Sequence, residues 1–269
     1  MKTGYVSDAG GVQMLENGRK IFEWHEGQRM ARHHLKVVRE AAKRHIAVNP
    51  HEPIKDTGLR RTYPNWVSRE GQRGMEYNAW GEPKNPPDHE VNLVFTRMLS
   101  GPMDYTPGIL SLTGRGNTPI PSTLARQLAL YVVLYSPIQM AADLPENYER
   151  NPVPFQFIKD VAVDWDDTRL LAGDLGDYAV IARKERNKGN WFVGAITDEQ
   201  QRRAEIDLDF LEPGRRYRAE IYRDGDNADY RTMPTAFVRE ERIVTAADSL
   251  NLLLAPGGGA AIRFVPIGK

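Results

Sequence analysis

The chain changes character near residue 164, and this change limits the folds that it can adopt. Upstream, short strand-like runs alternate with stretches of helical periodicity. The expected strands cover residues 4–6, 46–49, 74–77, 102–105 and 138–142, and the expected helices cover 26–45, 91–99 and 122–135. Such alternation is typical of a parallel sheet or barrel, and about four βα units fit before residue 160. We therefore predict an α/β fold in which residues 1–163 form the C-terminal half of a (β/α)8 TIM barrel.

Downstream of residue 164 the sequence contains strand patterns only. The runs 178–183 and 191–196 flank the polar turn 187–190, which is a hairpin signal. Apolar and polar residues then alternate over 206–210 and again over 250–254. This pattern predicts an all-β, sandwich-like domain over residues 164–269.

Composition excludes several classes of function. Thirty-six Lys and Arg balance thirty-six Asp and Glu, so no long-range field favours nucleic acid or an anionic membrane. The most apolar run, Leu128 to Leu134, is too short to span a bilayer. The absence of cysteine excludes disulfides, thiolate metal sites and a Cys nucleophile. The opening residues 1–11 lack the apolar stretch of a secretory signal and read as the end of a strand, so we expect an N-terminal portion to be missing.

Carboxylates follow the expected barrel strands. His51 and Glu52 end one strand, Glu70 lies in the next loop, and Glu76 is placed on the following strand. Because strand ends converge on one face of a barrel, these groups can meet around a substrate. Glycoside hydrolysis needs one protonated acid and one ionised base, and a hard cation such as Ca²⁺ would relieve repulsion among three carboxylates. The alternative is that these are solvated loop carboxylates, since Glu is mostly exposed.

Five sequence strings favour a functional site over solvated loop carboxylates. They are VNPHEP (48–53), TGLRRTYPN (57–65), REGQRGMEYNAW (69–80) and FTRMLSGPMDYTPG (95–108), and a fifth, QLALYVVLYSPIQMAADLPENY, covers 127–148. Together they resemble glycoside hydrolase family 97 over nearly the whole chain. The string GPMDYTPG is much more specific than any single Glu.

The resemblance implies roles for individual residues. Glu76 is similar to the family's general acid, and Glu52 to a calcium-binding carboxylate that helps to activate water. Glu70 resembles a further calcium ligand, and we include Glu76 in the expected Ca²⁺ site. His51 resembles a substrate contact, although a structural histidine is nearly as consistent with its position. Asp104 and Tyr105 are candidate substrate contacts, or they hold the strand end.

The opening KTGYV bears on the mechanism. Retaining members of the family, including α-galactosidases, carry a nucleophilic Asp where this chain has Gly4. The resemblance therefore implies the inverting, α-glucosidase-like branch, with water as nucleophile and an α-linked gluco-oligosaccharide as substrate. It also implies a bacterial periplasmic or secreted enzyme. Another base carboxylate and another calcium ligand belong to the absent half of the barrel, so a second polypeptide or self-association is expected to complete it.

Other readings stay open or are weaker. The chain could be a carbohydrate-binding module, an inactive structural fragment, or an α-galactosidase of the same family. We assign His33, His34 and His45 to a solvated helix face and the run 224–229 to a β-turn, because this run lacks the Gly and Glu that a calcium loop requires. The residues Glu23, His25 and Glu26 precede a helix and could approach the site.

Overall fold

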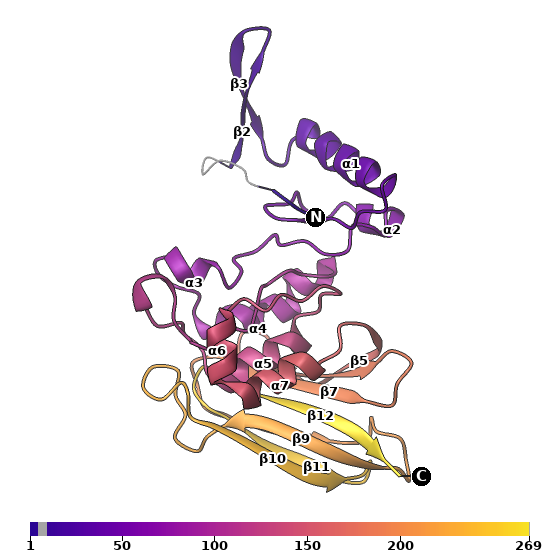
Figure 1. Ribbon diagram of the computed structural model, residues 1–269, viewed down its shortest axis with the longest axis vertical. Helices are drawn as coiled ribbons and strands as arrows, with labels where there is room; N and C mark the ends of the chain where they lie inside the picture. Colours follow the sequence, from indigo (N-terminus) through magenta and orange to yellow (C-terminus); the bar gives the residue numbers. More distant parts are fainter. Residues whose placement is uncertain (5–9, 269) are drawn as a thin grey trace.

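The computed structural model describes residues 1–4 and 10–268, so Tyr5 and Val6 of the first expected strand lie outside the described residues. The molecule is a mixed α/β structure with three tiers along its longest axis (Figure 1). An N-terminal tier carries a hairpin and α1, a middle tier carries α3 to α7, and an all-β domain forms the opposite end. None of the helices in the described ranges has the length and apolar content needed to cross a membrane.

The N-terminal tier contains a short parallel pair. Strand β1 (Lys2–Thr3) pairs with β4 (Asn49–Pro50), and α1 (Gln28–Ala42) connects them within the expected helical range 26–45. A hairpin of β2 (Gly11–Glu16) and β3 (Arg19–Trp24) precedes α1 and was not predicted. It turns at Asn17 and Gly18, both with positive φ, which is the geometry that an Asn-Gly turn favours.

Extended segments lie side by side in chain order between residues 48 and 136. Val67 N donates to Val48 O, Asp104 N donates to Arg69 O, and Met103 N donates to Tyr135 O. These isolated bonds do not form continuous ladders, so Pro102–Tyr105 is extended without being a regular strand. The expected strands 74–77 and 138–142 are wrong. Residues 75–77 form a turn and the start of α3, and residues 138–142 are a bend followed by irregular chain, while the neighbouring segments 66–70 and 135–136 make the bonds instead.

The middle tier contains five helices in the described part of the chain, of which α4, α5 and α7 pack on one face of the β-domain. They are α3 (Tyr77–Trp80), α4 (Pro87–Phe95), α5 (Leu124–Val133), α6 (Pro145–Arg150) and α7 (Pro152–Asp160), with α2 (Leu59–Thr62) above them and the 3-10 turns η1 (Arg97–Ser100) and η2 (Arg115–Asn117) between. Every residue of α5 is buried. The expected helix 122–135 starts at Ser122, but the residue that caps α5 is Thr123, whose hydroxyl accepts a hydrogen bond from Arg126 N.

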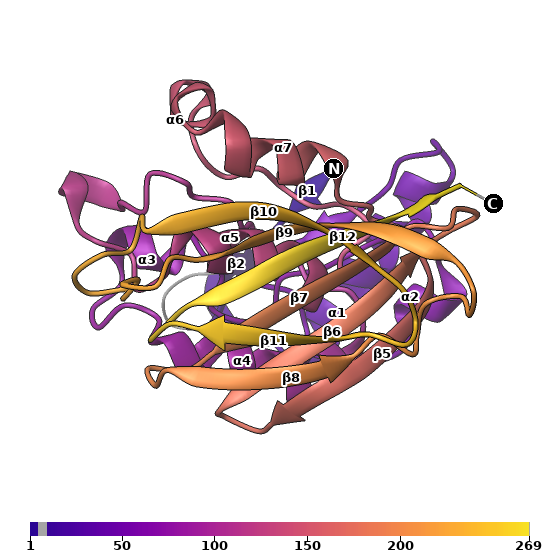
Figure 2. The ribbon, with the colours of Figure 1, turned by 90° about the horizontal axis from the view of Figure 1, so that it is seen from below.

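The β-domain contains eight antiparallel strands in two layers (Figure 2). The large sheet has the order β10-β9-β12-β7-β6-β5, and β8 and β11 form the second layer. Their bounds are β5 (Trp165–Asp174), β6 (Tyr178–Glu185), β7 (Trp191–Thr197), β8 (Arg202–Asp207), β9 (Arg216–Asp224), β10 (Phe237–Val244), β11 (Ser249–Leu254) and β12 (Gly259–Ile267). The predicted hairpin is confirmed as β6 and β7.

Two cores lie on opposite faces of the large sheet. One fills the space between the sheet and the β8–β11 layer, with Val193, Leu208 and Leu252 among its members. The other joins Leu128 of α5 and Val91 of α4 to the sheet. The helical tier and the β-domain therefore share one continuous hydrophobic core, which fixes the loops above α4 and α5 relative to the sheet.

Candidate active site

A buried histidine lies at the centre of the expected carboxylates. His51 follows β4, and its Nε2 is 2.8 Å from Asp104 Oδ2 while its Nδ1 is 3.4 Å from Glu70 Oε2. The three residues come from successive extended segments, 48–51, 66–70 and 103–105. The segment order therefore brings His51, Glu70 and Asp104 together, as the expectation of converging strand ends requires.

Asp104 is held as an anion. Its carboxylate is 1% exposed, and Oδ2 accepts a hydrogen bond of 2.6 Å from Asn49 Nδ2 as well as the contact from His51. Lys2 Nζ lies 3.7 Å away. Burial alone would raise the pKa of Asp104, but the hydrogen bonds from His51 and Asn49 outweigh it and lower this pKa.

The pKa values of His51 and Glu70 are both raised, but for different reasons. Burial favours neutral His51, yet the bond to Asp104 and the charge of Glu70 raise the pKa of His51. Burial raises the pKa of Glu70, and the charges of Glu52 and Glu76 raise it further, against the lowering effect of His51. The contacts with Asp104 and Glu70 favour the protonated form of His51 between the two carboxyl groups.

Glu52 lies next to Gly4, the position that is expected to distinguish inverting from retaining members. Its backbone has φ 42°, and its N–H donates to Glu70 Oε2 at 3.4 Å. A Cβ built on Gly4 would overlap the carbonyl oxygen of His51 and would lie 2.9 Å from Glu52 Oε2. Position 4 therefore admits no side chain unless Glu52 and His51 move.

Glu76 is exposed and starts the short helix α3 rather than lying on a strand. The preceding residue ties this loop to the segment 103–105, because Met75 N donates to Tyr105 O at 2.9 Å. The charge of Glu76 reaches Glu70, where it contributes to the raised pKa. The expected acid and the expected calcium ligand thus belong to one electrostatic cluster.

Tyr105 differs from expectation. Its ring is 0% exposed and lies in the core, and its hydroxyl donates to Glu90 of α4. The side chain of Tyr105 therefore does not line a substrate pocket in this structure. Its neighbour Asp104 does lie in the cluster, although its carboxylate is occupied by His51 and Asn49.

A cavity of about 380 Å³ opens beside Glu52 and Gly4, under the β2–β3 hairpin. Its lining includes Thr3, His25 and His34. In the described part of the chain, Thr3 Oγ1, both ring nitrogens of His25 and Nε2 of His34 are buried without a hydrogen-bond partner. Since buried polar groups are normally paired, these atoms are suited to a ligand rich in hydroxyl groups.

His34 was assigned to a solvated face of α1, and that assignment is wrong. The residue is 6% exposed, stacks on Trp66 with ring centroids 5.9 Å apart, and has its pKa lowered to about 4, first by burial. His34 is therefore neutral near pH 7. The spacing of Met30, His34 and Val38 on the buried face could have revealed this, since residues four apart share one face of a helix.

The carboxylates have the chemistry that Ca²⁺ prefers, but they do not by themselves form a metal site. Glu52, Glu70 and Glu76 supply hard oxygen ligands, and mutual repulsion contributes to the raised pKa of Glu70. Nevertheless, over residues 1–4 and 10–268 no group of three His, Asp or Glu side chains is arranged to hold a metal ion. The shared calcium site therefore stays a prediction that needs further oxygen ligands.

Family models match both ends of the chain. Residues 1–72 match the model described as glycoside hydrolase 97, and residues 164–265 match the model described as glycosyl-hydrolase 97 C-terminal, oligomerisation. A retaining alpha-galactosidase from Bacteroides thetaiotaomicron is 36% identical over 268 residues, which covers 94% of this chain and 39% of that protein.

Solved structures give a closer match. A glycoside hydrolase family 97 enzyme from Pseudoalteromonas sp. strain K8, in complex with acarbose, is 56% identical with a TM-score of 0.95. A variant of that family enzyme from the same strain, in complex with panose, gives the same values. The match covers 99% of this chain and 42% of those chains. The chain therefore spans about two fifths of the length of the relatives that it matches.

Proposed function

Because the chain belongs to glycoside hydrolase family 97, we propose that it carries part of an active site that hydrolyses α-glucosidic bonds of oligosaccharides with inversion. The observation that carries this proposal is the cluster of Glu70 and Asp104 around His51, next to Glu52, which lines a cavity with unpaired polar atoms. Such a cavity suits a sugar ring, which offers several hydroxyl groups at once.

The proposed mechanism divides two roles between two carboxyl groups. Glu76, exposed on its loop, donates a proton to the leaving oxygen, while Glu52, at the cavity wall, accepts a proton from the attacking water. His51 and Asp104 hold the neighbouring charges in place. Gly4 supports inversion, since it supplies no nucleophile and its surroundings leave no room for one.

The choice of an α-glucoside rests on the relatives that are 56% identical, whose structures hold acarbose and panose. Panose is a glucose trisaccharide. An α-galactoside is the second candidate, because the relatives at 36% and 34% identity are named as a retaining and a probable retaining alpha-galactosidase. Their retaining chemistry requires a nucleophile, and Gly4 argues against one at this position.

We also propose that residues 1–163 are part of a (β/α)8 barrel. The support is the order of the extended segments, because each one bonds to the segment that precedes it in the chain: 49–51 to 1–3, 66–70 to 48–50, 103–104 to 69 and 135 to 103. The first two of these contacts are parallel, and consecutive parallel neighbours are typical of a barrel wall. The helices α1, α4 and α5 lie between successive segments in the sequence.

Calcium would be held by Glu52 and Glu70, with Glu76 nearby and further oxygen ligands from the remainder of the catalytic domain. When bound, the cation would neutralise the cluster and stabilise an ionised Glu70. The residues of this chain bind and orient the sugar, hold the proton on Glu76 and receive the proton of the water on Glu52.

The test uses the intact protein that contains these residues, with panose, 4-nitrophenyl α-glucoside and 4-nitrophenyl α-galactoside as substrates. We expect turnover of the glucosides, with β-glucose as the first product by proton NMR. Glu76→Gln should reduce kcat on panose by about 100-fold or more, and much less on an aryl glucoside with an acidic leaving group that needs little protonation.

Glu82→Gln is the matched control, since Glu82 is exposed a few residues further along the same loop region. It should leave both rates unchanged. Equal losses on the two glucosides for Glu76→Gln would remove this residue from the acid role. A first product in the α-configuration, or turnover of the galactoside alone, would overturn the proposed mechanism or the proposed substrate.

A further inference from the structure

We propose that the buried pair Arg126 and Glu90 is a positioning device that connects the β-domain to the candidate active site through Tyr105. The proposal rests on the proposed function for its kinetic consequences, but its structural consequence can be measured without activity. In this device Arg126 fixes Glu90, Glu90 fixes the Tyr105 hydroxyl, and the backbone around Tyr105 fixes Asp104 and the loop that carries Glu76.

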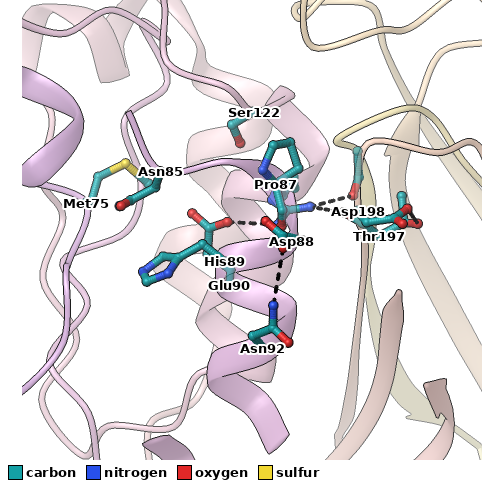
Figure 3. A network of polar contacts seen from close by, with 12 residues as sticks. Met75, Asn85, Pro87, Asp88, His89, Glu90, Asn92, Ser122, Thr197 and Asp198 are labelled. Atoms are coloured by element: carbon teal, nitrogen blue, oxygen red, sulfur yellow. Dashed lines mark hydrogen bonds and ion pairs between the residues drawn. The ribbon is translucent and has the colours of Figure 1, made fainter. Parts of the chain in front are cut away.

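Arg126 joins three parts of the molecule from the first turn of α5. Its side chain is 0% exposed, and Nη2 lies 2.9 Å from Glu90 Oε2 and also donates to Pro87 O. Its Nη1 donates to Thr197 O and lies 3.4 Å from Gly258 O, so it reaches the end of β7 and the loop that precedes β12. Figure 3 shows Pro87 and Glu90 on α4 beside Thr197 and Asp198 of the β-domain.

Glu90 connects Arg126 to the candidate active site through the hydroxyl of Tyr105. One carboxylate oxygen accepts from Arg126, and the other accepts from the Tyr105 hydroxyl. Glu90 is 4% exposed, so both oxygens are satisfied away from water. Removing one partner of a buried charge pair leaves the other charge uncompensated and strongly destabilises the protein. The two side chains are therefore held in one arrangement in the folded state.

The backbone of Tyr105 holds two functional groups at once. On one side is Asp104, which contacts His51. On the other side, the carbonyl of Tyr105 accepts from Met75 N, the residue before Glu76. The intervening loop is packed closely, because a Cβ on Gly74 would lie 3.3 Å from Tyr105 O and 3.4 Å from Glu70 Oε1. A displacement of Tyr105 therefore moves the expected acid and the His51–Asp104 pair together.

The alternative is that Arg126 only stabilises the shared core. The two roles differ in their consequences, since a core residue changes stability and a positioning residue changes the geometry of proton transfer. Arg183 of β6 provides a matched control: it is also buried and joins the β-domain to α5 through Val132 O, and it bonds Thr168 Oγ1 rather than any group of the site.

The experiment compares Tyr105→Phe, Arg126→Met and the control Arg183→Met in the intact protein. Tyr105→Phe removes one hydroxyl and keeps the ring, so it preserves the fold even if Arg126→Met does not. We expect Tyr105→Phe to lower kcat on panose by between about 10- and 100-fold with KM nearly unchanged, and to lower kcat less on an aryl glucoside with an acidic leaving group. Arg183→Met should lower Tm without changing the ratio of the two rates.

Hydrogen exchange gives the readout that does not depend on activity. The amides of Met75 and Asp104 should exchange faster in Tyr105→Phe and in folded Arg126→Met, but not in Arg183→Met. Unchanged exchange at these amides in Tyr105→Phe, or a rate ratio that shifts equally in the control, would overturn the proposal. Failure of the proposed function is distinct, because it would appear as a wild-type protein that does not hydrolyse glucosides.

Discussion

At the scale of single residues, the chemistry of the site depends on what surrounds each side chain. Glu70 and Asp104 both contact His51, but their pKa values shift in opposite directions. Burial acts to raise both pKa values. At Asp104 the hydrogen bonds from His51 and Asn49 outweigh burial, whereas at Glu70 burial prevails and the charges of Glu52 and Glu76 add to it. The sequence could place these residues at strand ends, but it could not show which carboxyl the imidazole would satisfy, since that depends on contacts between distant segments.

Gly4 gives a residue-scale prediction. Gly4→Ala should reduce activity by about 100-fold or more, because the added Cβ overlaps the carbonyl oxygen of His51 and crowds Glu52. Gly4→Asp should be similarly inactive and should not convert the enzyme to retention. The control is Gly58→Ala, where φ is also positive but no atom lies within 4 Å. It tests backbone strain alone, which costs about 1 kcal/mol, and should keep its activity.

These variants are compared by initial rates on panose and by proton NMR of the first product. An active Gly4→Asp enzyme that releases α-glucose would show that position 4 accepts a nucleophile, and that the steric argument is wrong.

At the scale of elements, local sequence patterns predict a helix or strand correctly where contacts within the segment determine its structure. The helix α1, the β6–β7 hairpin and the strand β11 follow their patterns. The alternating run 206–210 does not, because only Ile206 and Asp207 lie in a strand, at the end of β8, and a turn follows at Asp209. The β2–β3 hairpin was not expected, although its Asn17-Gly18 turn is a hairpin signal. Residues 74–77 carry a β-like run, yet the bond from Met75 N to Tyr105 O starts a turn there, and that contact lies thirty residues away.

Asp224 provides the prediction at this scale, because it attaches the start of α5 to the β-domain. Its carboxylate accepts from Thr123 Oγ1, Ala255 N and Gly259 N. Burial raises the pKa of Asp224 to about 6 despite these bonds. Because this value exceeds the reference of 3.8, the folded state binds the proton more tightly, and stability falls as pH rises from about 4 through about 6.

Asp224→Asn should remove this dependence, since an amide can accept from the two N–H groups and donate to Thr123. We expect the free energy of unfolding of the variant, minus that of the wild type, to rise by roughly 3 kcal/mol between pH 4 and pH 7 and then to level off. Urea unfolding at several pH values measures the difference, and exposed Asp226→Asn is the control. A difference that is flat with pH would contradict the assignment.

At the scale of the whole molecule, the β-domain and the helical tier form a complete core, while the segments around the site do not form a closed sheet. Within the described residues, β1 pairs with β4 and with no other strand. The hairpin also exposes Leu15, Phe22 and Trp24 to solvent. The family model for residues 164–265 carries the description oligomerisation. The β-domain is therefore a second candidate surface for association, besides the edge of β1 and the exposed side chains of the β2–β3 hairpin.

The 269-residue chain on its own should therefore bind Ca²⁺ weakly, associate in solution and fail to hydrolyse panose. Its carboxylates lack the arrangement of a metal site over the described residues, so we expect a Kd near or above about 1 mM by calorimetry. An open sheet edge and exposed apolar side chains favour pairing with another chain, which light scattering detects as a mass above 30.5 kDa. Ser substitutions at Phe22 and Trp24 should lower that mass if the chains associate through the hairpin, and should leave it unchanged if they associate through the β-domain.

The expected lack of activity follows from the geometry of inversion. Inversion requires acid and base on opposite sides of the sugar, and the relatives extend over more than twice the length of this chain. A monomer that turns over panose in excess Ca²⁺, with its activity abolished by Glu76→Gln, would show that these residues complete the site by themselves.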